Sequence, residues 1–139
     1  MIDVELISRK LKFISEYTAE LEEIFSASAN EEILANSLKY HTAERLFQLV
    51  VDAMIDINIH IIRTQNVIPP DDFESTFIAL GKSKVLPDDF AVHIAPVVGL
   101  RNRVVHRYES LQRNQFIDEL RKNLSDFKQF AIHISKLLK

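Results

Sequence analysis

The sequence predicts an all-α protein, an antiparallel bundle of four or five helices. The chain of 139 residues contains only two glycines and four prolines, so it offers little turn chemistry and should consist mostly of long helices. Apolar residues recur at helical spacing in several segments, and no segment shows the alternation of a strand. The length suits one domain, residues 1–139, with a core large enough to need neither disulfides nor metal.

The N-terminal half predicts one helix followed by a long central helix. In the first helix one stripe is apolar, formed by Ile7, Leu11, Ile14, Leu21 and Phe25. The segment SASANEE, residues 26–32, provides a helix stop and then an Asn/Glu restart. The next helix is short at first and then long through AERLFQLVVDAMIDINIHII, residues 43–62. Because this stretch is apolar on nearly all sides, we expect it at the centre of the bundle.

The C-terminal half predicts three further helices. The segment VIPPDD, residues 67–72, ends the long helix and supplies two aspartates that begin the next one. Gly81 and Pro87 bracket a loop, and the aspartate pair 88–89 begins a fourth helix that carries GLRNRVVHRYE, residues 99–109. The apolar stripe of the last helix consists of Phe116, Leu120, Leu124, Phe127, Ala131, Ile134 and Leu138.

The composition argues against several classes of protein. Without cysteine, the chain offers neither a thiolate metal site nor a disulfide framework, which suits a cytoplasmic location. The first twenty residues carry charges throughout and no continuous apolar region, so we expect no signal peptide. Polar residues interrupt the longest apolar run, which argues against a membrane span and a membrane partner.

The charge of the chain is unevenly distributed. The net charge is −3, with −8 over residues 1–94 and +5 over residues 95–139. A protein that is acidic overall is a poor non-specific binder of nucleic acid. A basic final third can nevertheless hold phosphates at one local site. The alternative is a basic C-terminal region that is simply offset by acidic neighbours.

A row of polar residues marks the long helix. It contains Glu44, Gln48, Asp52, Asp56 and His60, which recur every four residues on an otherwise apolar element. Either this polar row faces solvent, or part of it lines a site and orients an arginine or a histidine of the fourth helix. The spacing alone does not single out one residue.

The segment RNRVVHRY, residues 101–108, carries the side chains best suited to chemistry. Histidine exchanges protons near neutral pH, and the planar fork of arginine suits phosphate oxygens. His106 and Arg101 together can assist attack of an RNA 2′-OH on the adjacent phosphodiester, a reaction that needs no metal and no cofactor. The sequence shows no ligand spacing of a metal site, no cysteine nucleophile and no glycine-rich phosphate loop. The alternative is a solvated, positively charged helix surface.

The spacing of these two residues constrains the site. Arg101 and His106 are five positions apart and point about 140° apart on an ideal helix, so one straight helix does not cup a phosphate well. Pro96 and Gly99 can loosen the helix locally. Alternatively, two copies can meet across a two-fold axis so that four such side chains converge. The second solution predicts a homodimer with its cleft at the interface.

The same segment resembles the R-x4-H-x-Y form of the motif of HEPN ribonucleases. Arg101 corresponds to the arginine of this motif, Asn102 to the polar residue that often follows it, His106 to the histidine and Tyr108 to the tyrosine. The stretch AERLFQLVVDAMIDINIHII resembles the long second helix of the HepT-like branch, and LSDFKQFAIHISKLL resembles its closing helix. The resemblance therefore covers most of the chain.

The resemblance implies a HEPN-like bundle and a metal-independent endoribonuclease toxin of a type VII-like toxin–antitoxin system. It implies a homodimer that cleaves RNA at the two-fold interface, and a minimal nucleotidyltransferase antitoxin that adenylylates Tyr108. Arg101 would bind and polarise the scissile phosphate, His106 would act as general acid and base, and Asn102 would orient the substrate or partner side chains. The alternatives are a non-catalytic HEPN module that binds a nucleotide or the nucleotidyltransferase, and a purely structural dimer.

Overall fold

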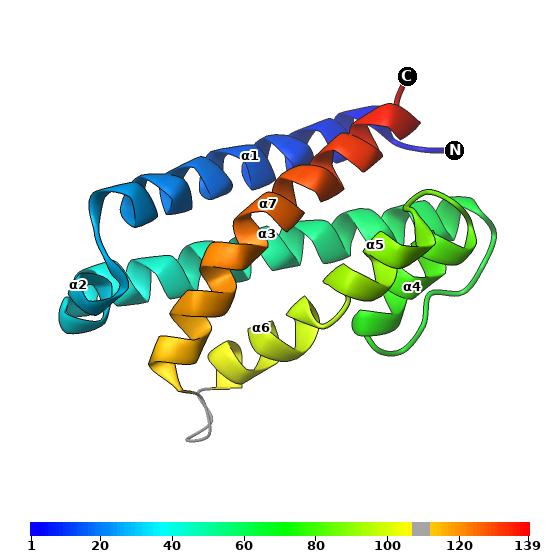
Figure 1. The fold of residues 1–139 in the computed structure, drawn as a ribbon. Helices are drawn as coiled ribbons and strands as arrows, with labels where there is room; N and C mark the ends of the chain where they lie inside the picture. The colour runs from blue at the N-terminus through cyan, green and yellow to red at the C-terminus, as the bar shows by residue number, and fades with distance from the viewer. Residues whose placement is uncertain (107–111) are drawn as a thin grey trace.

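The computed structural model describes residues 1–106 and 112–139, which form seven helices and no strand. The helices are α1 (Val4–Ala27), α2 (Asn30–Ala35), α3 (Ser37–Thr64), α4 (Glu74–Lys82), α5 (Asp88–Ile94), α6 (Val97–His106) and α7 (Arg113–Leu137). Helix α3 runs through the middle of the bundle and packs against α1, α2, α4 and α6 (Figure 1). Helix α7 packs on α1 and α2 and also meets α3, where Phe116 and Phe127 contact Phe47. Both chain ends lie at the same end of the bundle. The predicted all-α bundle is confirmed.

Short polar side chains begin two of the helices. The Asp3 carboxylate accepts a hydrogen bond from the backbone N–H of Leu6 at 3.0 Å, and Asn36 accepts one from Lys39 at 3.1 Å. These contacts satisfy N–H groups that have no partner inside the helix. The predicted restart after the first helix is also confirmed, since α2 begins at Asn30 and is separated from α3 by a single residue.

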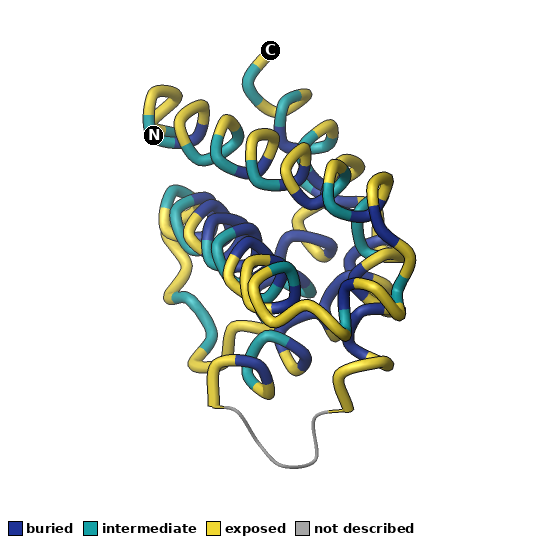
Figure 2. Tube along the Cα trace, turned by 90° about the vertical axis from the view of Figure 1, so that its left-hand side faces the viewer, coloured by how far each residue is buried: buried dark blue, intermediate teal, exposed yellow. Residues whose placement is uncertain are grey.

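The predicted apolar stripes form the core. Ile7, Ile14, Leu21 and Phe25 of α1 are buried, and so are Phe116, Leu120, Phe127 and Ile134 of α7. Figure 2 shows these helices with their buried sides turned toward the bundle interior. Phe130, which lies outside the predicted stripe, is also fully buried and packs edge-on against Phe77 of α4, with the two ring centroids 5.9 Å apart. Among residues 1–106 and 112–139, no helix combines the length and apolar character needed to cross a membrane.

The predicted fourth helix is in fact two helices. Helix α5 ends at Ile94, and α6 begins at Val97 after a turn that contains Pro96. Proline has no N–H to donate to the carbonyl four residues earlier, and its ring clashes with that carbonyl, so the helix is interrupted at Pro96. The prediction of one helix from the aspartate pair 88–89 onward is therefore wrong. The break lets α6 take its own direction and bring Arg101 against α3.

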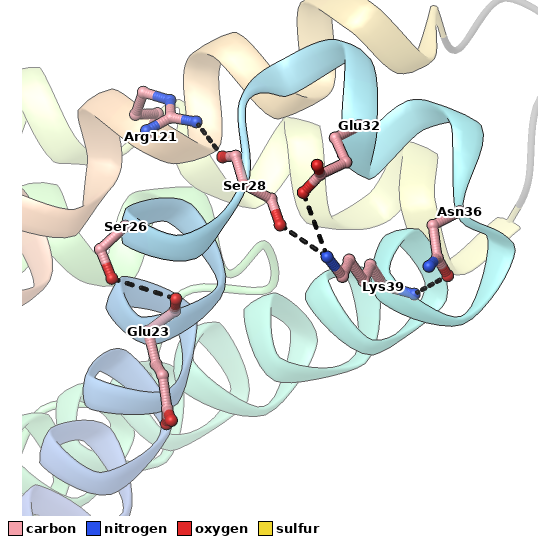
Figure 3. Close-up of polar contacts among 7 residues, drawn as sticks. All are labelled: Glu23, Ser26, Ser28, Glu32, Asn36, Lys39 and Arg121. Atoms are coloured by element: carbon pink, nitrogen blue, oxygen red, sulfur yellow. Dashed lines mark hydrogen bonds and ion pairs between the residues drawn. The ribbon is translucent and has the colours of Figure 1, made fainter.

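Polar contacts fix the junction of α1, α2 and α3 (Figure 3). Lys39 Nζ donates to Ser28 Oγ at 2.7 Å and lies 3.2 Å from a carboxylate oxygen of Glu32. Hydrogen bonds from Ser28 and Lys39 hold the pKa of Glu32 below its ordinary value. Arg121 of α7 donates to the backbone carbonyls of Phe25 at 3.2 Å and Ser28 at 3.4 Å. The N-terminal end of α3 and the helix α7 are thus both tied to the turn between α1 and α2.

The two glycines differ in the space around them, which leads to opposite expected effects of alanine. A Cβ at Gly99 of α6 would meet no heavy atom within 4 Å, so Gly99→Ala is expected to raise the free energy of unfolding by about 0.5–1 kcal/mol through helix propensity. A Cβ at Gly81 would lie 2.7 Å from the Cβ of buried Ala91. Gly81→Ala is therefore expected to lower stability by about 1–3 kcal/mol. Urea denaturation of both variants measures the difference, and a stabilised Gly81→Ala protein would contradict the close approach of α4 and α5.

Candidate active site

Arg101 of α6 contacts Asp52 of α3. Its Nε lies 3.0 Å and its Nη2 2.9 Å from the same carboxylate oxygen, Oδ1. The Arg101 side chain is 21% exposed and that of Asp52 is 41% exposed, so the pair lies at the edge of the core rather than inside it. Because Nε and Nη2 form one edge of the planar guanidinium, a single carboxylate fixes the plane of the group.

The remaining donors of Arg101 point elsewhere. Nη1 donates to the side-chain oxygen of Asn102 at 3.2 Å. A guanidinium has five N–H donors, so the edge formed by Nη1 and Nη2 can still address a planar anion while Asp52 holds the adjacent edge formed by Nε and Nη2. Asn102 thus contacts the arginine directly. Asp52 and Asn102 together give Arg101 a defined orientation on the surface of the bundle.

His106 is the last residue of α6 and is exposed. It lies on the same helix as Arg101, five positions further on, in the arrangement that the sequence predicts. Tyr108 lies outside the described residues. Within the described parts of the chain, no three His, Cys, Asp or Glu side chains form a group that could hold a metal ion.

One member of the polar row of α3 orients an arginine of the motif segment, and two others contact α1. Asp56 forms an ion pair with Lys10 of α1 at 2.8 Å, and His60 accepts a hydrogen bond from the backbone N–H of Asp3 at 2.9 Å. These two residues therefore hold the N-terminal helix. Asp52 instead orients the arginine of the motif helix, as the second alternative proposed. The remaining members, Glu44 and Gln48, contact neighbours on α3 itself.

The sequence indicated the row but not the residue that orients Arg101. Asp52 and Arg101 are 49 positions apart, and five polar residues of the row were equivalent by spacing. What singles out Asp52 is its position in the folded structure. Since α6 packs on α3, a carboxylate at the crossing point is placed beside the arginine. His41 and Arg45, which adjoin the row, carried no signal of their own in the sequence.

The fold is that of the HEPN toxins. It is similar to the structure of the tri-AMPylated HEPN toxin of Shewanella oneidensis in complex with MNT antitoxin, with a TM-score of 0.86 at 24% identity over 98% of this chain and 99% of that one. A toxin–antitoxin crystal structure with AMP-PNP has the same TM-score, 0.86, at 22% identity over 95% of this chain and 98% of that one. The chain belongs to the ribonuclease HepT-like family, whose model matches residues 14–134.

Curated relatives agree with the family. The chain is 33% identical over 138 residues to the tRNA nuclease HepT of Aphanizomenon flos-aquae, covering 99% of this chain and 92% of that protein. It is 31% identical over 83 residues to the mRNA nuclease HepT of Shewanella oneidensis, covering 60% of this chain and 62% of that protein. The family predicted from the motif is confirmed, and with it the prediction of an enzyme of the ribonuclease class.

Proposed function

We propose that this protein is a metal-independent endoribonuclease and the toxin of a toxin–antitoxin pair, with Arg101 and His106 as its catalytic residues. The observation that carries the proposal is the Asp52–Arg101 contact, which fixes a guanidinium on the same helix as an exposed histidine. An oriented, permanently charged group and a proton carrier are the two parts that RNA cleavage by the 2′-OH needs.

The proposed reaction is an internal transfer of the phosphoryl group. A histidine removes the proton of the 2′-OH as its oxygen attacks the adjacent phosphorus, and the bond to the 5′-oxygen of the next nucleotide breaks. A second proton then goes to the leaving 5′-oxygen, which gives a 2′,3′-cyclic phosphate and a free 5′-OH. The guanidinium of Arg101 stabilises the negative charge that develops on the phosphate oxygens. Asn102, which accepts a hydrogen bond from Arg101, orients the substrate or the arginine itself.

A homodimer supplies the second proton carrier. One protomer contributes one His106, whereas the proposed reaction takes up one proton and gives one away, at two different oxygens. If two copies meet across a two-fold axis, each cleft has two His106 and two Arg101 side chains. Mixing wild-type chains with inactive His106→Ala chains tests this arrangement. For a shared cleft, activity should fall with the square of the wild-type fraction. A strictly linear decrease, or a fully active monomer by light scattering, would contradict it.

The proposed partner is a nucleotidyltransferase antitoxin that adenylylates Tyr108. Support comes from the relatives of the same fold, one of which is AMPylated and in complex with MNT antitoxin. Transfer of AMP to the tyrosine oxygen forms a phosphodiester to the ring and releases pyrophosphate from ATP. The added group is bulky and negatively charged, so it can occupy the phosphate position beside Arg101 and exclude RNA.

The direct test of the proposed function is cleavage of single-stranded RNA in excess chelator. The wild-type protein is expected to cleave, because neither a histidine nor an arginine needs a metal for this reaction. Dependence on Mg²⁺ would contradict the proposed mechanism. Absence of any cleavage, with RNA still bound, would favour a non-catalytic HEPN module instead.

Asp52 acts on the reaction by positioning Arg101, which predicts different effects for two replacements. Asp52→Ala leaves the guanidinium unoriented and is expected to lower kcat about 10- to 100-fold, the scale for misplacing a catalytic group. Asp52→Asn keeps the shape and an acceptor oxygen, so it should retain most of the activity. The matched control is Asp56→Ala one turn further along α3, where the carboxylate pairs with Lys10. Equal losses in Asp52→Ala and Asp56→Ala would show that the contact with Arg101 is not what matters.

A further inference from the structure

A second polar site lies on α3, beyond Asp52 and toward the N-terminal end of that helix. Helices α3 and α6 run in opposite directions (Figure 1), so the part of α6 after Arg101 runs alongside the part of α3 before Asp52. At a rise of about 1.5 Å per residue, Gln48 and Glu44 lie about 6 Å and 12 Å from Asp52 along α3, in the direction of His106. The polar row of α3 therefore continues from the Asp52–Arg101 contact past the end of α6.

Four side chains line a hollow at this place. His41, Glu44, Arg45 and Gln48 line an open hollow of about 480 Å³ on the surface of α3. Nδ1 of His41 lies 2.7 Å from Oε1 of Glu44, and Arg45 Nη1 donates to Oε1 of Gln48 at 3.3 Å. The Glu44 side chain is 15% exposed and lines the hollow, and its contact with His41 holds the carboxylate in one orientation.

Aromatic packing supports one side of this hollow. The buried ring of Tyr40 contacts the His41 ring edge-on at 5.4 Å, and the guanidinium of Arg113 from α7 lies 4.5 Å from the Tyr40 ring centroid. Burial, together with the charge of Glu44, raises the pKa of Tyr40 to about 12. The phenol is thus neutral at physiological pH, and the Glu44 carboxylate lies close to it. Arg113 thus approaches this side of α3 through Tyr40, whereas Arg45 contacts Gln48.

We infer that His41, Glu44, Arg45 and Gln48 form a nucleobase subsite that selects guanine next to the scissile phosphate. A carboxylate accepts two parallel hydrogen bonds from N1–H and the N2 amine of guanine, and no other RNA base presents that pair of donors on one edge. Arginine donates to guanine O6 and N7, the commonest base-specific contact of that side chain. A carboxylate beside an arginine therefore matches guanine at both edges, and Gln48 adds a donor and an acceptor.

The position of the subsite determines what it would control. The inference rests on the proposed function, because it assumes that the phosphate held by Arg101 belongs to RNA. A base bound one to two turns of α3 away from Asp52 belongs to a nucleotide flanking the one that reacts, so the subsite would set the cleavage position. Splayed, unpaired bases are what such pockets recognise, which makes single strands and loops the expected substrates.

Binding of short RNAs to the full-length His106→Ala protein tests the subsite without cleavage. Two oligouridylates are compared by fluorescence anisotropy, one with a single guanosine and the other with inosine at that place, since inosine lacks only the N2 amine. The guanosine RNA should bind about tenfold more tightly, the scale for one hydrogen bond to a charged acceptor. Adding Glu44→Gln, which removes that charge, should bring the ratio of the two dissociation constants to about one.

Matched variants separate recognition from general electrostatics. Glu20→Gln, at an exposed position of α1, should leave the guanosine-to-inosine ratio unchanged. Arg45→Ala should weaken binding of the guanosine RNA, whereas Arg63→Ala, exposed at the other end of α3, should not. Equal affinities for guanosine and inosine RNA, or no RNA binding at all, would overturn the subsite. The proposed function is tested separately, because its failure would appear as absence of cleavage by the wild-type protein. The ratio of the two dissociation constants tests only the subsite.

Discussion

His106→Ala is expected to lower kcat/KM for RNA cleavage at least about 100-fold, the usual scale for loss of a general acid or base. Arg101→Ala should cause a loss of similar size, because the charge on the transition-state phosphate then has no fixed counter-charge. The double variant should lose much less than the product of the two factors, since both side chains serve one transition state. Initial rates on a single-stranded RNA in chelator provide the measurement.

The control for this prediction lies on the same helix. Arg103 has the same charge as Arg101 and is exposed, but it lies outside the contact with Asp52. Arg103→Ala should reduce RNA affinity modestly and change kcat less than about tenfold. Circular dichroism and thermal melting establish that all variants are folded. Undiminished cleavage by both His106→Ala and Arg101→Ala would remove the proposed active site.

Tyr108→Phe is expected to make the toxin insensitive to its antitoxin. Phenylalanine retains the ring but lacks the oxygen that accepts AMP, so the variant should resist modification and remain toxic when a nucleotidyltransferase partner is co-expressed. The wild-type chain should gain mass in AMP units under the same conditions and lose ribonuclease activity. Growth of the expressing cells and peptide mass spectrometry of the purified chain measure the two effects.

A matched tyrosine gives the control for the modification. Tyr17 of α1 is partly buried and stacks on Phe13 at 6.0 Å, so Tyr17→Phe should be modified and neutralised like the wild-type protein. AMP found on another residue would show that Tyr108 is not the modified position. Full neutralisation of Tyr108→Phe by the partner would show that adenylylation of this tyrosine is not how the toxin is controlled.

The fold was largely predictable because its signals are local. The restart at Asn30 follows from residues next to it in the chain, and the stripe of α1 follows from helical period alone. Phe130 was not predictable in this way. A single apolar stripe predicts only one buried side of a helix. Helix α7 also packs against Phe77 of α4 through Phe130, so a second side of α7 is buried. The break at Pro96 shows a different limit, since the proline was noted but its effect on helix direction depends on packing.

The candidate site was predictable in part. The side chains of the motif occupy one short segment, so Arg101, Asn102 and His106 could be proposed together from the sequence. Their support could not, because the Asp52–Arg101 contact joins residues 49 positions apart. The hollow around Glu44 is lined by four residues of α3, and the sequence did not indicate the side-chain contacts among them.

The Asp52 carboxylate gives Arg101 an internal counterion before any substrate arrives. A phosphate must compete with that counterion, so its binding exchanges one ionic partner for another and releases less bound salt than an unpaired arginine would. Attraction of RNA at long range then depends on exposed charges nearby, among them Arg103, rather than on Arg101. For the same reason a free phosphate or a cleaved end should leave Arg101 readily, since Asp52 is already in place to take back its ionic partner.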